Sequence, residues 1–400
     1  MKRALALLVS FAVAASALPA LGADTIKIGE INSYSRIPQF LTPYKNGLDM
    51  AVEEINASGG VLGKKLEVIT RDDGGNPATA ERHATELVQN EKVALLAGTF
   101  LSNIGLAVSS FAKRNKVLFV AAEPLTDDLT WKEGHRYVFR LRPNTYSQSW
   151  MVAKEAAKLP AKKWATVAPN YEYGQSFVEQ FKAILSQLRP DVQWVGEQWP
   201  ALGKIDAGAT VQALAMAQPD AIFNATFGAD LSKFVREGNN RGLFKNRSVV
   251  SVLTGEPDYM EPLKDEAPEG WIVTGYPWYE INNAAHKAFV DAYMKKYNDT
   301  PKLGTIVGYI TFKAIAAGIK KAGSTDTEAM IKAMEGLKFD TPVGPVTFRD
   351  FDHQSTLGAW VGKTKYDAKR GWGVMVDWKY IDGSAALPDK KWVSSVRPKD

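Results

Sequence analysis

The chain reads IKIGEI at residues 26–31, GLDMAVEEINASGGVLG at 47–63 and LEVI at 66–69. Apolar residues nearly alternate in the first and third segments, which predicts β-strands. Between them, apolar residues recur every three or four positions over residues 44–55, which predicts one face of an amphipathic helix. The double glycine that follows ends this helix, because glycine readily adopts positive φ. The region therefore predicts a strand–helix–strand unit.

The same alternation continues along the chain. Asn76-Pro77 is typical of a helix N-cap followed by proline in the first turn. A second series begins after Arg142-Pro143-Asn144. Strands that alternate with helices at this spacing predict an α/β fold with two parallel sheets. The predicted strands are at 93–97, 117–121, 165–168, 192–197, 221–224, 249–253, 272–275, 359–361 and 374–378, and helices are predicted at 102–115, 284–297, 305–322 and 327–335.

The first 23 residues predict a secretory signal peptide. A basic start, an apolar run at 4–18 and small residues after Pro19 are typical of such a leader. The apolar run is shorter than the roughly 20 residues that span a bilayer. The chain has no cysteine, so we expect neither disulfides nor a lipid-bearing cysteine. The apolar helix at 305–319 contains Lys313 and is interpreted as a core helix, so we expect a mature protein free in the periplasm.

Several function classes lack their usual signals. With 49 basic and 44 acidic residues and no basic run longer than two, the chain carries no nucleic-acid footprint. Its four histidines do not have metal-ligand spacing. Residues 60–65 lack the spacing of a phosphate loop, and residues 174–178 lack the second glycine of a nucleophile elbow. We therefore expect no metal, no cofactor and no enzymatic activity.

Candidate binding residues follow the predicted strands. In open parallel sheets, ligands bind beyond the carboxyl ends of the strands. Ser102 could hold a carboxylate at the start of its helix or simply cap that helix. Glu123 could be a ligand group or a solvated loop charge, and Glu256 could bind an ammonium or cap the next turn. Tyr173 and Phe227 lie in equivalent junctions and could form the walls of a pocket.

Residues 26–31 and 47–63, with Asp72-Asp73, Pro77-Ala78 and Tyr173-Gly174, resemble the branched-chain amino-acid-binding (Leu/Ile/Val-binding) family of ABC-transporter substrate-binding proteins. The resemblance covers nearly the whole mature chain. It implies a type I periplasmic-binding-protein fold, with two Rossmann-like lobes joined by a three-stranded hinge. The crossovers are expected near Arg142-Pro143, Gly275-Tyr276 and Pro345-Val346. The implied lobes are 24–142 with 277–345 (N-terminal) and 143–276 with 346–400 (C-terminal).

The resemblance also implies a function and a set of site residues. The protein would be the periplasmic receptor of an ABC importer, a monomer that binds an amino acid between its lobes and delivers it to the permease. Ser102 would hold the ligand carboxylate and Glu256 would pair with its amino group. Leu125 stands where the family offers a hydroxyl. The other implied contacts are Tyr34, Ser35, Phe100, Glu123, Tyr173, Phe227 and Tyr279.

Two alternatives remain open. An amine-free aromatic or aliphatic carboxylate, or an amide, would suit the extra aromatics Tyr34, Phe100 and Trp278, with Arg36 or tyrosines binding the acid. A ligand-sensing module that regulates a partner protein is the second alternative. The predicted signal peptide and the lack of an attached effector domain count against it.

Overall fold

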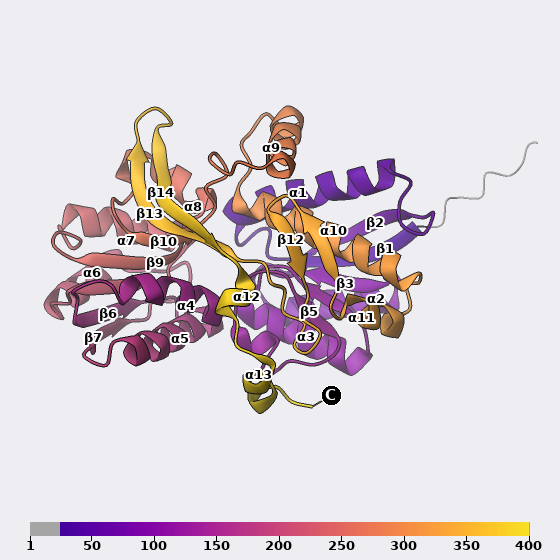
Figure 1. The fold of residues 1–400 in the computed structure, drawn as a ribbon, viewed down its shortest axis with the longest axis horizontal. Coiled ribbons are helices and arrows are strands. Elements are labelled where there is room, and N and C mark those ends of the chain that lie inside the picture. The colour runs from indigo at the N-terminus through magenta and orange to yellow at the C-terminus, as the bar shows by residue number, and fades with distance from the viewer. Residues whose placement is uncertain (1–24, 400) are drawn as a thin grey trace, which may run out of the picture.

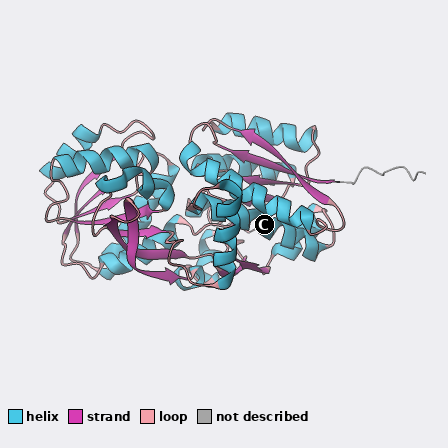
Figure 2. Ribbon diagram, turned by 90° about the horizontal axis from the view of Figure 1, so that it is seen from above, coloured by secondary structure: helices cyan, strands magenta, loops and turns pink. Residues whose placement is uncertain are grey.

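Two α/β lobes lie side by side in the computed structural model, which describes residues 25–399 (Figure 1). Each lobe has its own sheet with helices packed around it (Figure 2). The predicted signal peptide, residues 1–23, lies outside the described residues. The two-lobed α/β architecture predicted from the alternation of strands and helices is confirmed.

The N-terminal lobe is built on a five-stranded sheet of order β2-β1-β3-β4-β5, in which every pairing is parallel. Because parallel neighbours need a crossover, helices connect most of these strands. The elements are β1 (Thr25–Asn32), α1 (Pro38–Ala57), β2 (Lys65–Asp72), α2 (Pro77–Gln89), β3 (Leu95–Gly98), α3 (Ser102–Asn115), β4 (Phe119–Ala121), η1 (Asp127–Leu129) and β5 (Val138–Arg140), and later α9 (Ala284–Tyr297), α10 (Leu303–Ala322), α11 (Thr327–Met334), β11 (Lys338–Thr341) and β12 (Gly344–Thr347).

The C-terminal lobe is built on a seven-stranded sheet of order β14-β13-β10-β9-β8-β6-β7. Its last two strands, β13 and β14, run antiparallel and form one edge. The elements are α4 (Thr145–Ala156), β6 (Lys163–Val167), α5 (Glu172–Leu188), β7 (Gln193–Gln198), α6 (Ala207–Met216), β8 (Ala221–Asn224), α7 (Gly228–Asn240), β9 (Ser248–Gly255), α8 (Pro257–Met260), η2 (Glu261–Glu266), β10 (Ile272–Gly275), β13 (Ala359–Asp367) and β14 (Trp372–Ile381), followed by α12 (Gly383–Ala386) and α13 (Lys390–Val396).

The chain passes between the two sheets three times. It does so between β5 and α4, between β10 and α9, and between β12 and β13. The first and third passages lie together. Arg140 forms an isolated parallel β-bridge with Gln354, and the Arg140 carbonyl accepts from the Ser355 N–H at 2.9 Å. The third crossover was predicted near Pro345-Val346, but these residues lie in β12, which pairs with β11 as a hairpin. The chain therefore crosses later, within residues 348–358.

Helix α10 packs unusually close to α1 in the N-terminal lobe. A Cβ added at Gly308 would lie 2.2 Å from the Tyr44 carbonyl oxygen, and one at Gly47 would lie 1.8 Å from the Thr305 carbonyl oxygen. Glycine is therefore required where the two backbones meet. By length and composition α10 is the one helix of the described part that could cross a membrane, yet 78% of its apolar window is buried. It is a core helix, as the sequence predicted.

The two lobes are closed on each other. The Asp258 carboxylate, in the C-terminal lobe, accepts from the Leu303 and Gly304 N–H groups of α10 at 2.8 and 3.3 Å. On another part of the cleft the Thr126 hydroxyl donates to Glu172 at 2.5 Å. Such contacts exist only when the lobes touch, so the structure shows the shut form of the hinge.

Candidate ligand-binding site

The predicted binding residues gather where the carboxyl ends of both sheets face the cleft. Ser102 follows β3 and Glu123 follows β4 in one lobe. Tyr173 follows β6, Phe227 follows β8 and Glu256 follows β9 in the other. Parallel strands end at the same edge of a sheet, so residues far apart in sequence meet here.

A buried group of three charges lies at the centre, which we call the Glu–Arg–Glu triad: Glu123, Arg142 and Glu256. The Arg142 guanidinium donates through Nη1 to Glu123 Oε2 at 2.9 Å and through Nη2 to Glu256 Oε1 at 2.6 Å. The three side chains are only 5%, 0% and 1% exposed for Arg142, Glu123 and Glu256. Arg142 comes from the first crossover, so the triad ties both lobes to the hinge.

The triad carries one more negative than positive group when all three are ionised. Glu123 Oε1 and Glu256 Oε2 are buried and have no hydrogen-bond partner among the described residues. Burial raises the pKa of each carboxyl to about 7, although Arg142 opposes that rise. Burial disfavours the charge of Arg142, but Glu256 and Glu123 outweigh it and raise its pKa. The site therefore offers two unused carboxylate oxygens to a hydrogen-bond donor or a cation.

Five rings form an aromatic cluster beside the triad: Phe40, Phe100, Tyr173, Phe227 and Tyr259. Ring centroids are 5.1 Å apart for Phe40 and Phe100, 5.9 Å for Phe100 and Phe227, and 5.2 Å for Tyr173 and Phe227. The Arg142 guanidinium lies 5.8 Å from the Phe40 ring centre. Both tyrosine hydroxyls are buried without a partner in the described chain. Aromatic faces attract cations and also pack against flat apolar groups.

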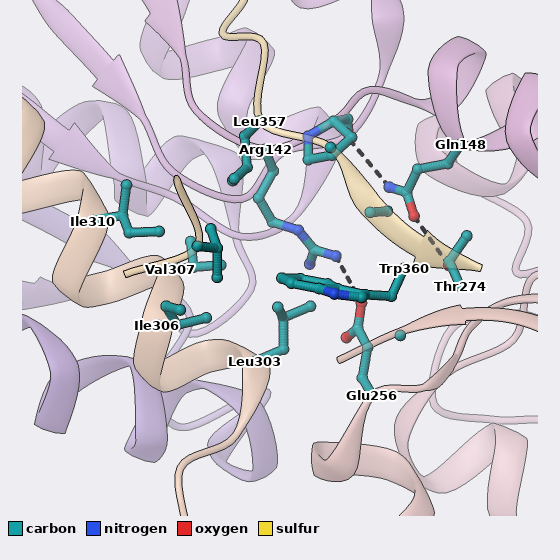
Figure 3. A pocket seen from close by; sticks show the side chains of 15 residues that line it. Arg142, Gln148, Glu256, Thr274, Leu303, Ile306, Val307, Ile310, Leu357 and Trp360 are labelled. Atoms are coloured by element: carbon teal, nitrogen blue, oxygen red, sulfur yellow. Dashed lines mark hydrogen bonds and ion pairs between the residues drawn. The ribbon is translucent and has the colours of Figure 1, made fainter. Parts of the chain in front are cut away.

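A small cavity extends from the triad toward the hinge. Figure 3 shows Arg142 paired with Glu256, and aliphatic side chains of α10 pointing toward the cavity. The space open to the centre of a water molecule is about 20 Å³, which holds about one water. A ligand the size of an amino acid therefore needs the lobes to part first. The lining residues are Arg142, Pro143, Gln148, Glu256, Thr274, Gly275, Leu303, Ile306, Val307, Ile310, Val343, Leu357, Gly358, Ala359 and Trp360.

Two strand ends next to the site hold strained backbone. Thr99, after β3, has φ of 59°, and Leu253, near the end of β9, has φ of 65°. Branched residues rarely adopt positive φ. Such strain persists where the surrounding structure fixes the backbone, and it clusters at functional sites. The loops that present the first turn of α3 and Glu256 are thus held in set positions.

Ser102 and Leu125 are buried where the N-terminal lobe meets the cleft. The Ser102 hydroxyl accepts from the Leu125 and Thr126 N–H groups at 3.3 and 3.2 Å. The interpretation of Ser102 as a helix cap is wrong, because Leu101 is the N-cap residue and no side chain caps α3. The serine instead joins the loop after β3 to the loop after β4.

The first loop and Tyr279 lie outside the triad and its rings. Ser35 is exposed, and its N–H binds the Asp72 carboxylate at 3.2 Å. Arg36 is exposed and donates to the Leu202 carbonyl at 2.9 Å, so it reaches across to the other lobe. Tyr34 is partly buried, with its hydroxyl unpaired in the described chain.

Tyr279 packs against the β14 edge of the C-terminal lobe. Its hydroxyl accepts from the Met375 N–H at 2.5 Å. The Arg370 guanidinium lies over the Tyr279 ring, with its central carbon 4.7 Å from the ring centre. The Tyr279 ring also lies 5.7 Å from that of Trp278, and its role as a pocket wall remains a prediction.

Sequence reasoning missed four residues of the site: Phe40, Arg142, Tyr259 and Asp258. Arg142 was used only to mark where the second series begins and where the first crossover was expected. Phe40 lies before the helix predicted at 44–55, although α1 in fact begins at Pro38, and Tyr259 was assigned to no predicted element. The available signal was the position of Arg142 beside a proline at a lobe boundary, since a charge there faces either solvent or the cleft. The described residues contain no group of three metal-binding side chains.

Known proteins share this architecture. The Periplasmic binding protein family model matches residues 25–370. Leu/Ile/Val-binding protein homolog 7 of Brucella suis is 26% identical over 379 residues, covering 90% of this chain and 93% of that protein. A leucine-, isoleucine-, valine-, threonine-, and alanine-binding protein of Pseudomonas aeruginosa is 26% identical, and the match covers 86% of this chain and 90% of that protein. The ABC-transporter solute-binding protein of Rhodopseudomonas palustris BisB5, solved with 3,4-dihydroxybenzoic acid, is 25% identical and has a TM-score of 0.80. The match covers 92% of this chain and 99% of that one.

Two lobes that close a three-pass hinge over a buried, charged and aromatic cleft define a solute-binding protein. The chain belongs to the Periplasmic binding protein family. The resemblance to Leu/Ile/Val-binding proteins is confirmed by relatives that match most of its length. The family is one of transport receptors, which agrees with the expectation drawn from the sequence.

Proposed function

We propose that this protein is the periplasmic receptor of an ABC importer and that its ligand is an amino acid with an apolar or aromatic side chain. The ligand ammonium would lie against Glu123 Oε1 and Glu256 Oε2. The pair of buried carboxylate oxygens without partners in the described chain carries this proposal. An ammonium has three donors and one positive charge, so it would satisfy both oxygens and neutralise the triad.

The rest of the cleft supports the same ligand class. The first turn of α3 has no side-chain cap, so its N–H groups and the Ser102 hydroxyl can receive the ligand carboxylate. The aromatic cluster and the aliphatic residues of α10 would enclose the side chain with the lobes slightly farther apart than here, because the cavity between them holds only about one water. Phe100, Tyr173 and Phe227 keep their proposed place around the ligand, whereas Tyr34 belongs to the first loop, outside the triad and its rings. The names of the Brucella and Pseudomonas relatives support a branched-chain or other small apolar amino acid.

The transport setting belongs to the same proposal. A ligand that contacts both lobes stabilises the shut form, and the shut form is what a permease would recognise. We propose that the protein acts as a monomer in the periplasm after residues 1–23 are removed. It would release its ligand to the permease and perform no chemistry on it.

A second candidate is an aromatic carboxylate without an amine. The five-ring cluster and the dihydroxybenzoate-bound relative favour it. In that case Arg142, rather than the exposed Arg36, would pair with the acid. The difficulty is electrostatic, because a further negative charge would enter beside two carboxylates that share one guanidinium.

A thermal-shift screen followed by calorimetry tests the proposal. A ligand at a hundred times its Kd stabilises a protein by about 2.7 kcal/mol, which gives a clear rise in Tm. We expect a rise with leucine, valine or phenylalanine and little change with benzoate or 4-hydroxybenzoate. A rise with the benzoates alone would keep the receptor function and replace the ligand with the second candidate.

A further inference from the structure

The triad combines charges from three separate segments in a buried cleft. Glu123 follows β4, Glu256 precedes α8, and Arg142 lies in the first crossover. The guanidinium takes one oxygen of each carboxylate and leaves the other oxygen unpaired among the described residues. Without Arg142 the same cleft would hold two uncompensated negative groups.

Two other carboxylates, Asp258 and Glu261, already have hydrogen-bond or ion-pair partners. Asp258 lies close to Glu256, but its carboxylate accepts two N–H groups at the start of α10, where the helix dipole favours a negative charge. Lys302 pairs with Glu261 at 2.7 Å. Asp258 therefore adds negative charge beside Glu256, and Arg142 is the one member of the triad that offsets its two carboxylates.

We infer that Arg142 is the specificity-determining residue of this site. It lowers the net charge of the triad from two negative to one, and this single charge decides how strongly the site prefers a ligand with an amine over the same ligand without it. Buried charges are costly unless they are matched, so a change of one unit changes the preferred head group. The inference deepens the proposed function and rests on it for the placement of the ligand head group at the triad.

The test compares ligand pairs that differ only in the amine. Calorimetry at pH 8 gives Kd for phenylalanine and 3-phenylpropanoate, and for leucine and 4-methylpentanoate. The nearly isosteric variants Glu123→Gln and Glu256→Gln make the triad neutral. Arg142→Met makes it doubly negative, and the Arg142→Met/Glu123→Gln double variant returns it to one negative charge. The matched control is Glu261→Gln, which removes a charge from an ion pair between the lobes that is not part of the triad.

The measured quantity is the ratio of the two Kd values within a pair. We expect each glutamine variant to shift this ratio by at least roughly 30-fold toward the amine-free acid. Arg142→Met should shift it the other way, and the double variant should return to within about threefold of the wild type. Glu261→Gln should leave the ratio unchanged. A purely structural role for Arg142 would weaken both members of a pair equally.

Each outcome decides between the statements. The inference is overturned if the Kd ratio is unchanged in both glutamine variants. It is also overturned if the Kd ratio of the double variant does not return to near the wild-type value. If Arg142→Met fails to fold, shown by its circular dichroism and melting curve, the glutamine variants decide alone. A wild-type protein that prefers the amine-free acid contradicts the proposed ligand, yet the inference stands if the variants still shift the ratio as stated. A wild-type protein that binds none of the four overturns both.

Discussion

Glu123 and Glu256 share one guanidinium, and burial raises the pKa of each to about 7. Asp258, which faces them, has a pKa of about 8 for the same reason, with the Glu256 charge adding to the rise. At pH 7 these carboxyl groups are therefore partly protonated, and ligand binding can cause them to release protons or to take up more. The head group of the ligand decides which of these happens.

We expect an amino acid to release protons when it binds. Its ammonium favours the ionised carboxylates and lowers their pKa, so affinity should rise between pH 6 and pH 8, by at most about tenfold per unit for one proton. Calorimetry at pH 7 in phosphate and in Tris, which differ in ionisation enthalpy, measures the number of protons directly. Proton uptake on binding, with affinity that falls as pH rises, would instead indicate an amine-free acid.

Individual site residues could be predicted only in part. Ser102, Glu123, Tyr173, Phe227 and Glu256 all follow strands, and strand ends can be located from periodicity. Arg142 could not be assigned in this way, because its role depends on two carboxylates that lie far from it in the sequence and meet it only in the closed fold.

At the scale of elements, regular patterns were predicted well. Helix α3 at 102–115, β8, β10 and α9 match the predicted ranges. The short strand β5 and the β11–β12 hairpin carry too few residues for their period to show, and both depend on neighbours distant in sequence. The C-terminal helices α12 and α13 were missed for the same reason.

Asp258 caps a helix of the opposite lobe, so we expect it to couple closure to affinity. Asp258→Ala leaves the Leu303 and Gly304 N–H groups without their acceptor in the shut form, which costs about 1 kcal/mol, or roughly fivefold in Kd. Calorimetry with the best ligand measures this loss. Asp326→Ala is the matched control, because Asp326 caps α11 within one lobe. Asp326→Ala should lower Tm, because it also removes a helix cap, and leave Kd unchanged. Equal losses of affinity in the two variants would contradict the coupling.

The glycine contact between α1 and α10 leads to a stability prediction. Gly308→Ala places a methyl group 2.2 Å from the Tyr44 carbonyl oxygen, so the helices must move apart. We expect a loss of about 1–3 kcal/mol in the free energy of unfolding, measured by urea denaturation. Lys320→Ala, at an exposed position of the same helix, should change stability by less than about 0.5 kcal/mol. A stable Gly308→Ala variant would show that the two helices can separate freely.

At the scale of the whole molecule, a C-terminal strap (residues 382–397) crosses the hinge. The chain leaves the C-terminal lobe at the end of β14, and α13 lies below the junction of the lobes in Figure 1. The Trp392 ring lies 4.9 Å from Trp131 of the N-terminal lobe and 5.9 Å from Tyr146 of α4. Arg397 donates to the Thr130 carbonyl at 2.7 Å. The strap is thus a fourth connection between the lobes, added to the three crossovers.

The strap contacts residues of both lobes, so we expect it to limit how far the cleft opens. The Trp392→Ala/Arg397→Ala double variant removes its ring contacts and its hydrogen bonds to carbonyl oxygens. Without ligand, the radius of gyration measured by small-angle scattering should then increase, while the ligand-bound value stays that of the wild type. Met216→Ala, at a side chain that is 76% exposed, is the control for loss of surface apolar area. If the ligand-free radius does not change, the strap only covers the hinge, and opening is limited by the three crossovers themselves.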